Sequence, residues 1–397
     1  MRKKWYVLFV LILFVMQGAL LTAVDNPPKP VTKLIEKAEK AFKKNEIDKA
    51  MESYNQALAL APEYGPIYLG IARIQSSQKK YDEAVVNLEK ALQFDPESTT
   101  VKQFFANTLF NAGREASTQR DLNKANDYFT KLIGIPGISS QEPKYYLETL
   151  FQIGNNYSML EKFAQANDYF KKLVEIPEIA IADPGLVLHV YYKMGINANQ
   201  AQKFADSNTY LEKLLGFPNA QTNNSKVFTI CHYMVGLNSS QLKEYAKSEE
   251  YLNKFIELNK VEANNNPQLE PLAHFILGSN LMTVLDEEVQ KIRDDANEKR
   301  EKKKDIQELA GKSPQIETYL SKAIELQPEL EPAYMQLGNY YYYLGNIPKT
   351  IEYYKSLIEK FPTSQDIGAY KQFLTDLEKP VEVAKPEAKA DAKKKKK

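Results

Sequence analysis

The side chains best suited to catalysis or metal binding in this sequence are three histidines and one cysteine, namely His189, His232, His274 and Cys231. Imidazole can act as a general base or bind zinc, and a thiolate is a nucleophile. However, no G-x-x-x-x-G-K-[S/T], G-x-G-x-x-G, H-E-x-x-H or G-x-S-x-G motif occurs, and the carboxylates are scattered. The sequence therefore gives these four residues no recognisable catalytic setting.

The positions of the histidines favour packing over metal binding. His232 and His274 occupy a position that Tyr68, Leu150 and Tyr334 fill in other segments of the chain, and His189 is offset from it by two residues. Neighbouring helices lie 8–10 Å apart, which is too far for a shared zinc site at these positions. We expect core histidines, a buried Cys231, no metal, no cofactor and no enzyme. An enzyme that uses the histidines is the alternative.

Small residues recur at fixed intervals and show how the chain is organised. Twelve residues separate each member of a first set from its counterpart in a second set, with apolar residues at 3- and 4-residue steps around them. The two sets are Ala38, Ala72, Gly113, Gly154, Gly195, Gly236 and Gly338, and Ala50, Ala84, Ala125, Ala166, Ser207, Ser248 and Thr350. This pattern predicts an all-α solenoid of helical hairpins, in which each glycine permits close approach of the two helix backbones.

The predicted hairpins have defined limits. They cover residues 31–62, 64–96, 99–136, 141–177, 184–218, 224–259, 271–328 and 331–362, and a capping helix follows at 363–379. A charged insertion near 286–311 separates the helices of the seventh hairpin, and we expect it to project as a solvated arm. The arm is either a loop without a role or a docking element for a second partner.

The hairpin pattern resembles the tetratricopeptide repeat family. The resemblance rests on an aromatic/Leu–Gly–Tyr run in first helices and an Ala-x3-Phe/Tyr-x2-Ala run with a following proline in second helices. Examples are Tyr334, Leu337, Gly338 and Tyr341, and Ala50, Tyr54, Ala57 and Pro62. It implies a superhelix whose first helices line a concave groove. Four repeats depart from the pattern, because they carry a bulky residue where the family has alanine: Leu132, Leu173, Leu214 and Phe255.

Rings and amides recur at positions that the resemblance assigns to this groove. The predicted partner-binding residues are Phe110, Arg114, Phe151, Asn155, Tyr192, Asn199, Tyr233, Phe275 and Asn339. Aromatic rings supply contact area and amides can satisfy a peptide backbone, so these residues suit an extended peptide or a docked helix. The alternative is that the rings only complete the packing between adjacent hairpins.

The two ends of the chain differ from the repeats. Residues 1–23 combine a basic start with a short apolar run, which predicts a cleaved signal peptide, followed by a spacer at 24–30. Retention of residues 5–24 as a membrane anchor is the alternative. Residues 380–397 contain seven lysines and predict a disordered tail, with weak contact to an anionic membrane or cell-wall polymer.

Charge and composition narrow the function. The chain has 52 basic and 51 acidic residues, which argues against specific nucleic-acid binding, and one cysteine, which excludes a disulfide framework within the chain. We therefore expect a non-catalytic protein–protein interaction scaffold of the cell envelope, exported to the periplasm. The alternative is an assembly subunit anchored in the inner membrane and facing the periplasm.

Overall fold

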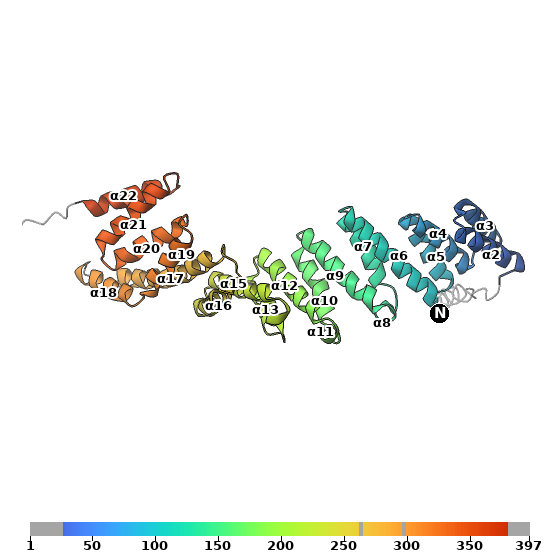
Figure 1. Cartoon of the computed structure of the whole chain (residues 1–397), viewed down its shortest axis with the longest axis horizontal. Coiled ribbons are helices and arrows are strands. Elements are labelled where there is room, and N and C mark those ends of the chain that lie inside the picture. The colour runs from blue at the N-terminus through green and yellow to red at the C-terminus, as the bar shows by residue number, and fades with distance from the viewer. Residues whose placement is uncertain (1–26, 262–264, 296–298, 380–397) are drawn as a thin grey trace, which may run out of the picture. The chain divides into compact units, whose positions relative to one another are not determined.

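A computed structural model describes residues 27–261, 265–295 and 299–379 of the chain (Figure 1). Every regular element in these ranges is an α-helix, which confirms the predicted all-α fold class. None of these helices is long and apolar enough to cross a membrane. The predicted signal peptide at 1–23 and the predicted tail at 380–397 lie outside the described residues, so both stay predictions.

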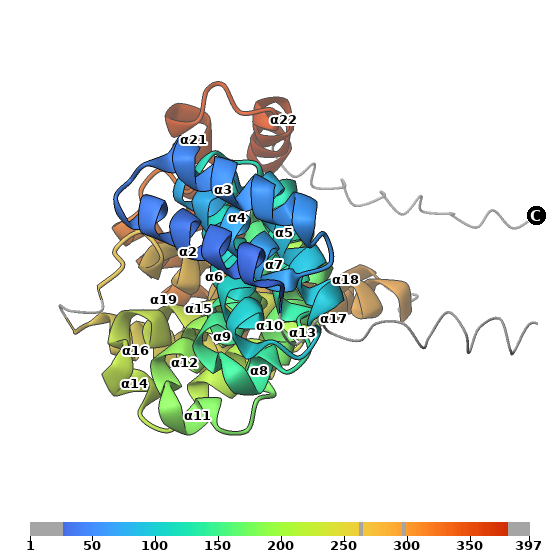
Figure 2. The same cartoon turned by 90° about the vertical axis from the view of Figure 1, so that its right-hand side faces the viewer.

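The helices fall into two compact units, residues 1–201 and 202–397. The division lies inside the predicted repeat at 184–218. Within the first unit consecutive helices pack side by side as hairpins (Figures 1 and 2). Its helices are α2 (Lys29–Lys43), α3 (Ile47–Leu60), α4 (Gly65–Ser77), α5 (Tyr81–Phe94), α6 (Thr99–Thr118), α7 (Leu122–Ile133), α8 (Ile138–Gln141), α9 (Pro143–Met159), α10 (Phe163–Val174), α11 (Ile179–Ala182) and α12 (Pro184–Gln200).

The second unit continues the same pattern of hairpins and ends with the predicted capping helix. Its helices are α13 (Phe204–Leu215), α14 (Ala220–Asn223), α15 (Ser225–Gln241), α16 (Tyr245–Asn259), α17 (Glu270–Asp295), α18 (Lys299–Gly311), α19 (Gln315–Leu326), α20 (Glu331–Tyr343), α21 (Ile347–Lys360) and α22 (Ile367–Glu378).

A residue with a left-handed backbone conformation reverses the chain between the two helices of most hairpins. In six turns this residue is not glycine, although its φ lies between 57° and 63°. The six residues are Asn45, Lys79, Arg120, Glu161, Gln202 and Lys243, and Gly345 takes the same place in the last hairpin with a φ of 73°. Within each unit, this shared turn fixes the register in which the two helices of a hairpin meet.

The long links after α7, α10 and α13 each contain a four-residue helix. These are α8, α11 and α14, and their buried residues Ile138, Ile179 and Ala220 lie 41 residues apart. Figures 1 and 2 show α8 and α11 on the same edge of the first unit. The links therefore add apolar packing to the hairpins that carry a bulky residue in place of alanine, and Leu132, Leu173, Leu214 and Phe255 are all buried.

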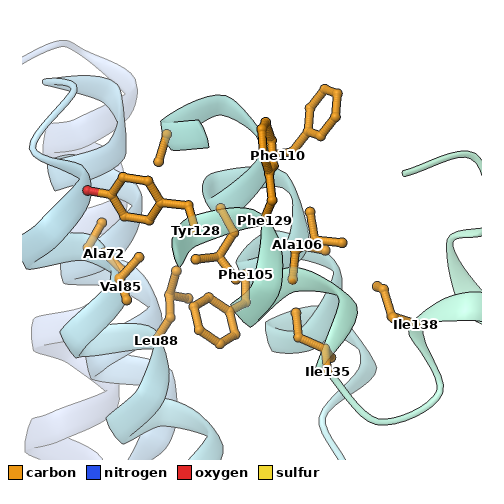
Figure 3. Packing of buried hydrophobic residues seen from close by; sticks show 14 of the residues in the cluster. Ala72, Val85, Leu88, Phe105, Ala106, Phe110, Tyr128, Phe129, Ile135 and Ile138 are labelled. Carbon is orange, nitrogen blue, oxygen red and sulfur yellow. The ribbon is translucent and has the colours of Figure 1, made fainter. Parts of the chain in front are cut away.

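The glycines of the first helices make room for a ring or a branched side chain, not for a backbone as the sequence analysis expected. A Cβ on Gly113 would lie 2.4 Å from the Phe129 ring, and one on Gly154 would lie 2.4 Å from the Phe170 ring. Figure 3 shows Phe129 in its cluster, beside Phe110. Phe129 and Phe170 are fully buried, so the absent Cβ is what admits these large residues to the hairpin core.

The charged insertion is part of the second unit and does not simply project into solvent as expected. α17 runs for 26 residues, and α18 folds back to pack against both α17 and α20. Val289 and Ala310 are buried, and the Tyr340 hydroxyl donates a hydrogen bond of 3.3 Å to the Ala310 carbonyl. The insertion therefore has an apolar side that the clustered charges of its sequence conceal.

Candidate partner-binding face

His232, His274 and Cys231 lie in packed surroundings, whereas His189 is exposed, so the expectation of a core histidine is wrong for His189. The His232 ring lies 5.7 Å from the Tyr251 ring, and the His274 ring lies 6.1 Å from the Tyr319 ring. Burial lowers the pKa of both histidines and raises the pKa of the Cys231 thiol to about 12. Among the described residues, no group of three or more His, Cys, Asp or Glu could hold a metal ion. These side chains are thus placed as neutral packing groups.

The predicted ladder of rings lies mainly inside the hairpins. Phe110 and Tyr233 are buried, and their ring centres lie 6.1 Å from Phe129 and 5.3 Å from Phe255, respectively. Phe151 is half-buried, 5.9 Å from the Phe170 ring. Because a buried ring offers little area to a partner, the packing alternative describes Phe110 and Tyr233. Tyr192 and Phe275 are half-buried and keep part of their surface accessible.

The predicted polar residues have varied environments. Arg114 is exposed, and its guanidinium lies 5.8 Å from the centre of the Phe110 ring. Asn155 and Asn199 are half-buried, and the Asn155 Oδ1 is buried without a hydrogen-bond partner in the described part of the chain. Asn339 is occupied, because its Oδ1 accepts a hydrogen bond of 2.7 Å from the Tyr354 hydroxyl. Arg114 and Asn155 are therefore the predicted residues best placed to meet a partner.

A different line of residues forms the uncovered face of the first helices. Residues at i, i+4 and i+7 lie on one face of a helix, and none of the fifteen residues in this line is buried in five successive first helices. In the first unit they are Asn107, Asn111 and Arg114 on α6, Glu148, Gln152 and Asn155 on α9, and His189, Lys193 and Ile196 on α12. In the second unit they are Ile230, Met234 and Leu237 on α15, and Leu272, Ile276 and Ser279 on α17.

We call this line the accessible face of each first helix. The adjacent line, one residue later, is buried at nearly every position, as Thr149, Ile153 and Asn156 show on α9. Of the partner-binding residues predicted from the sequence, Arg114 and Asn155 lie on this face, and its other residues were not predicted. The 41-residue interval between Asn111 and Gln152 is a sequence signal for the residues of this face, although neither residue is aromatic.

The accessible face in the first unit is polar. On α6 the Asn111 Nδ2 donates to the Asn107 Oδ1, and the Asn107 Nδ2 donates to the Tyr145 hydroxyl of α9 at 2.9 Å. On α9 the face extends by one turn to Met159, whose side chain is two-thirds exposed at 66%. Amides and one mobile thioether can satisfy the backbone of a bound segment and adapt to its side chains.

The accessible face in the second unit is aliphatic on α15 and α17. Met234, Leu237 and Ile276 are half-buried and pack around a core that contains Tyr233 and Leu277. Ser279 ends this stretch, because its hydroxyl donates a hydrogen bond of 2.8 Å to Gln336 on α20. Each unit therefore presents a face of different chemistry, one polar and one apolar.

Buried asparagines join successive repeats, and this role was not predicted from the sequence. In the first unit the Asn197 Nδ2 donates to the Asn167 Oδ1 and to the Ser158 hydroxyl, both at 2.9 Å. In the second unit the Asn280 Nδ2 donates to the Ser248 hydroxyl at 2.9 Å. We call Asn156, Asn197, Asn238 and Asn280 the repeat-bridging asparagines. They hold the first helices, and so the accessible faces, at a defined distance from the preceding hairpin.

This geometry defines a class. An all-helical chain of stacked hairpins, with uncovered first-helix faces and no metal-binding cluster among its described residues, is a helical-repeat protein of the kind that generally binds other proteins. The sequence matches two models of the tetratricopeptide repeat, one at residues 35–64, 65–98 and 231–261 and the other at residues 148–176 and 332–364. The chain therefore contains tetratricopeptide repeats.

Solved structures with a similar arrangement are remote. The apo form of RapI is 15% identical, with 85% of this chain and 98% of RapI covered at a TM-score of 0.38. YrrB, described as a tetratricopeptide-repeat protein with an unusual peptide-binding site, is 17% identical, with 53% and 93% covered at a TM-score of 0.32. A tetratricopeptide-repeat protein from Parabacteroides merdae is 12% identical, with 78% and 98% covered at a TM-score of 0.30. No curated protein sequence matches this chain.

Proposed function

We propose that this protein is a non-catalytic scaffold that binds a segment of a partner protein on the accessible faces of its first helices. The observation that carries the proposal is the contrast in burial on each helix. On α9, Glu148, Gln152 and Asn155 stay uncovered, while the line one residue later is buried between repeats. A continuous uncovered line on a rigid helix is a suitable surface for a second chain.

The polar face of the first unit suits a segment with free backbone groups. The Asn155 Oδ1 has no hydrogen-bond partner among the described residues although it is buried. A buried polar atom without a partner costs about 1–3 kcal/mol. Because this oxygen is closed to solvent, a backbone N–H of a bound segment reaches it only when the Asn155 side chain turns outward, whereas the partly accessible Gln152 amide can pair with the segment directly. An extended segment fits this requirement better than a helix, whose N–H groups are already used.

The aliphatic face of the second unit suits apolar side chains. Met234, Leu237 and Ile276 each keep part of their surface uncovered, and a partner that covers them removes apolar area from water at about 25 cal/mol per Å². Taken by itself, the second unit therefore suits a partner segment that carries apolar residues. Binding needs no reaction, in keeping with the general role of tetratricopeptide repeats.

A photoreactive amino acid placed on each face tests the proposal. We expect cross-links to a partner protein from position 152 on α9 in the first unit and, in a separate experiment, from position 234 on α15 in the second unit. The matched control is position 165, where another glutamine is exposed on the second helix α10. Cross-linking from position 165 as readily as from position 152 would show that the first-helix face has no special role.

We also propose that the protein acts in the cell envelope after export to the periplasm. The basic start and short apolar run of residues 1–23 support this location. Determination of the mature N-terminus tests it: a chain that begins near Val24 agrees with a cleaved signal. An intact N-terminus in the membrane fraction would favour the alternative, a membrane-anchored assembly subunit that keeps residues 5–24.

A further inference from the structure

A cleft of about 670 Å³ lies between the last repeat and the capping helix of the second unit. It is bounded by the start of α20, the end of α21 and the start of α22. Its lining includes Pro332, Met335 and Phe361, which offer apolar surface, and three carboxylates. The accessible faces described above lie on other helices, so this cleft is a separate feature.

The three carboxylates of the cleft are Glu329, Glu331 and Asp366, and none forms an ion pair with any described residue. The Glu331 carboxylate instead accepts hydrogen bonds from the Ser364 hydroxyl at 2.5 Å and the Tyr370 hydroxyl at 3.0 Å. The lining contains one basic residue, Lys360, whose Nζ lies 5.9 Å from the Tyr334 ring. The cleft therefore has a net negative charge and fixed acceptor groups.

Both kinds of lining match a lysine side chain. The aliphatic stem of lysine packs on apolar surface while its ammonium group stays close to carboxylates or water. In this cleft the stem would lie along Met335 or Phe361 and the ammonium group near Glu331 or Asp366. Several lysines in sequence would satisfy the cleft better than one, because Glu331 is the first residue of α20 while Glu329 and Asp366 lie in the links before α20 and α22.

The chain itself supplies such a segment. Residues 380–397 contain seven lysines against three acidic residues, and they follow directly after α22. α22 has 12 residues, so it spans about 18 Å from the cleft to the start of this segment. The thirteen residues 380–392 can extend up to about 45 Å, at roughly 3.5 Å per residue, before Lys393 is reached. Lys393–Lys397 can therefore reach the cleft from their own chain.

We propose that the lysine-rich segment 380–397 docks in the acidic cleft between α20, α21 and α22 of the same chain. Because the segment is tethered next to the cleft, its local concentration is high even where each contact is weak. The docked segment would occupy the end of the last repeat and keep it from other basic ligands. This inference does not depend on the partner-binding proposal, since its test needs no partner.

Zero-length carbodiimide coupling on the full chain tests the docking. The reagent joins a carboxylate to a lysine amine only where the two touch, and a protease that cleaves at acidic residues keeps the lysine cluster intact for mass spectrometry. We expect Lys393–Lys397 to couple to Glu329, Glu331 or Asp366 at least fivefold more often than to the exposed Glu352 and Glu359 of α21. Coupling should occur within single chains in dilute protein and fall severalfold in 0.5 M salt.

Two variants with equal charge change separate the cleft from general attraction. Glu329→Gln with Asp366→Asn should abolish the preference, and helix α22 should be kept because asparagine caps a helix as well as aspartate. Glu352→Gln with Glu359→Gln should leave the preference unchanged. Coupling spread evenly over all carboxylates, or found only between chains, would overturn the proposal. The proposal would also be overturned if the tail lysines couple to no cleft carboxylate and instead attach the full chain to vesicles of anionic lipid.

Discussion

The Nδ2 of Asn156 on α9 donates a hydrogen bond of 2.8 Å to the Oδ1 of Asn126 on α7, in the interior between two successive hairpins. Both side chains are buried, with exposed fractions of 3% and 4%. A polar pair in this place does not add to the hydrophobic core. Instead it stabilises one relative position of the two hairpins over displaced positions, because displacement would break this hydrogen bond and leave both amides unpaired.

Removal of this contact should destabilise the first unit. Asn156→Ala leaves the Asn126 oxygen buried without a donor, and we expect a loss of about 1–3 kcal/mol in the free energy of unfolding. Urea denaturation followed by circular dichroism measures it. Asn111→Ala on the exposed side of α6 is the matched control and should change stability by less than about 0.5 kcal/mol. An additive effect of Asn156→Ala and Asn126→Ala would contradict coupling between the two amides.

The glycine in the first helix should be needed because of the ring that fills its place. Gly154→Ala would put a Cβ 2.4 Å from the Phe170 ring, so we expect a loss of about 1–3 kcal/mol from overpacking. Gly154→Ala together with Phe170→Leu should lose less than the two single changes combined. The second repeat already contains this pair as Ala72 and Leu88, both fully buried. Melting temperatures of the wild type, the two single variants and the double variant measure this coupling. An unchanged melting temperature in Gly154→Ala would refute the steric explanation.

The thiol of Cys231 should be inert in the folded protein. Its side chain is fully buried, and burial raises its pKa to about 12, so almost no thiolate forms at neutral pH. We expect a maleimide to label the native chain far more slowly than the urea-unfolded chain. The chain has no other cysteine, so the label reports this site alone. Rapid labelling of the native protein would show that α15 is less tightly packed than described.

Stability of the second unit should fall as the pH falls below about 6.5. Burial lowers the pKa of His232 and His274, so in this range the unfolded chain binds protons that the folded chain resists. The free energy of unfolding therefore has its full value, as far as these two histidines are concerned, above the unfolded pKa of about 6.5, and it falls on acidification. Melting temperatures between pH 7.5 and 5.5 measure the effect, in a range above most carboxylate titration.

Variants assign this pH dependence to the buried rings. His232→Leu should reduce it, since Leu150 fills the same position on α9 and is fully buried. His189→Gln is the comparison: burial lowers the pKa of His189 as well, but this residue is more exposed than His232 and His274, so we expect a smaller effect. An unchanged pH dependence in His232→Leu would show that His232 does not cause it. A pH dependence that disappears only in His189→Gln would contradict its assignment to the buried rings.

The fold could be predicted from the sequence because it is local and repeated. The interval of 41 residues between Gly113, Gly154 and Gly195 fixes the period, and apolar steps of three and four residues fix the helices. The insertion near 286–311 was harder to interpret, because its charges dominate the sequence. The packing of Val289 and Ala310 depends on contacts with α20 that lie far away along the chain.

The candidate face could be predicted only in part. Arg114 and Asn155 lie on it, but Phe110 and Tyr233 turn inward, since the direction of a ring depends on the room that its neighbours leave. Gly113 and Phe129 create that room through a contact that a one-dimensional pattern does not show. The repeat-bridging asparagines were missed for a related reason: asparagine normally indicates an exposed site, and only tertiary partners make it a buried one.

The left-handed turn residues leave the protein room to become more resistant to heat. Arg120, Glu161 and Gln202 adopt a conformation that costs residues with a Cβ about 1–2 kcal/mol, whereas the last hairpin uses Gly345. Asparagine tolerates this conformation better, as Asn45 already illustrates. Successive turns are separated by whole hairpins, so such replacements would accumulate almost independently, and natural selection or a designer could adjust the melting point of this chain one bend at a time.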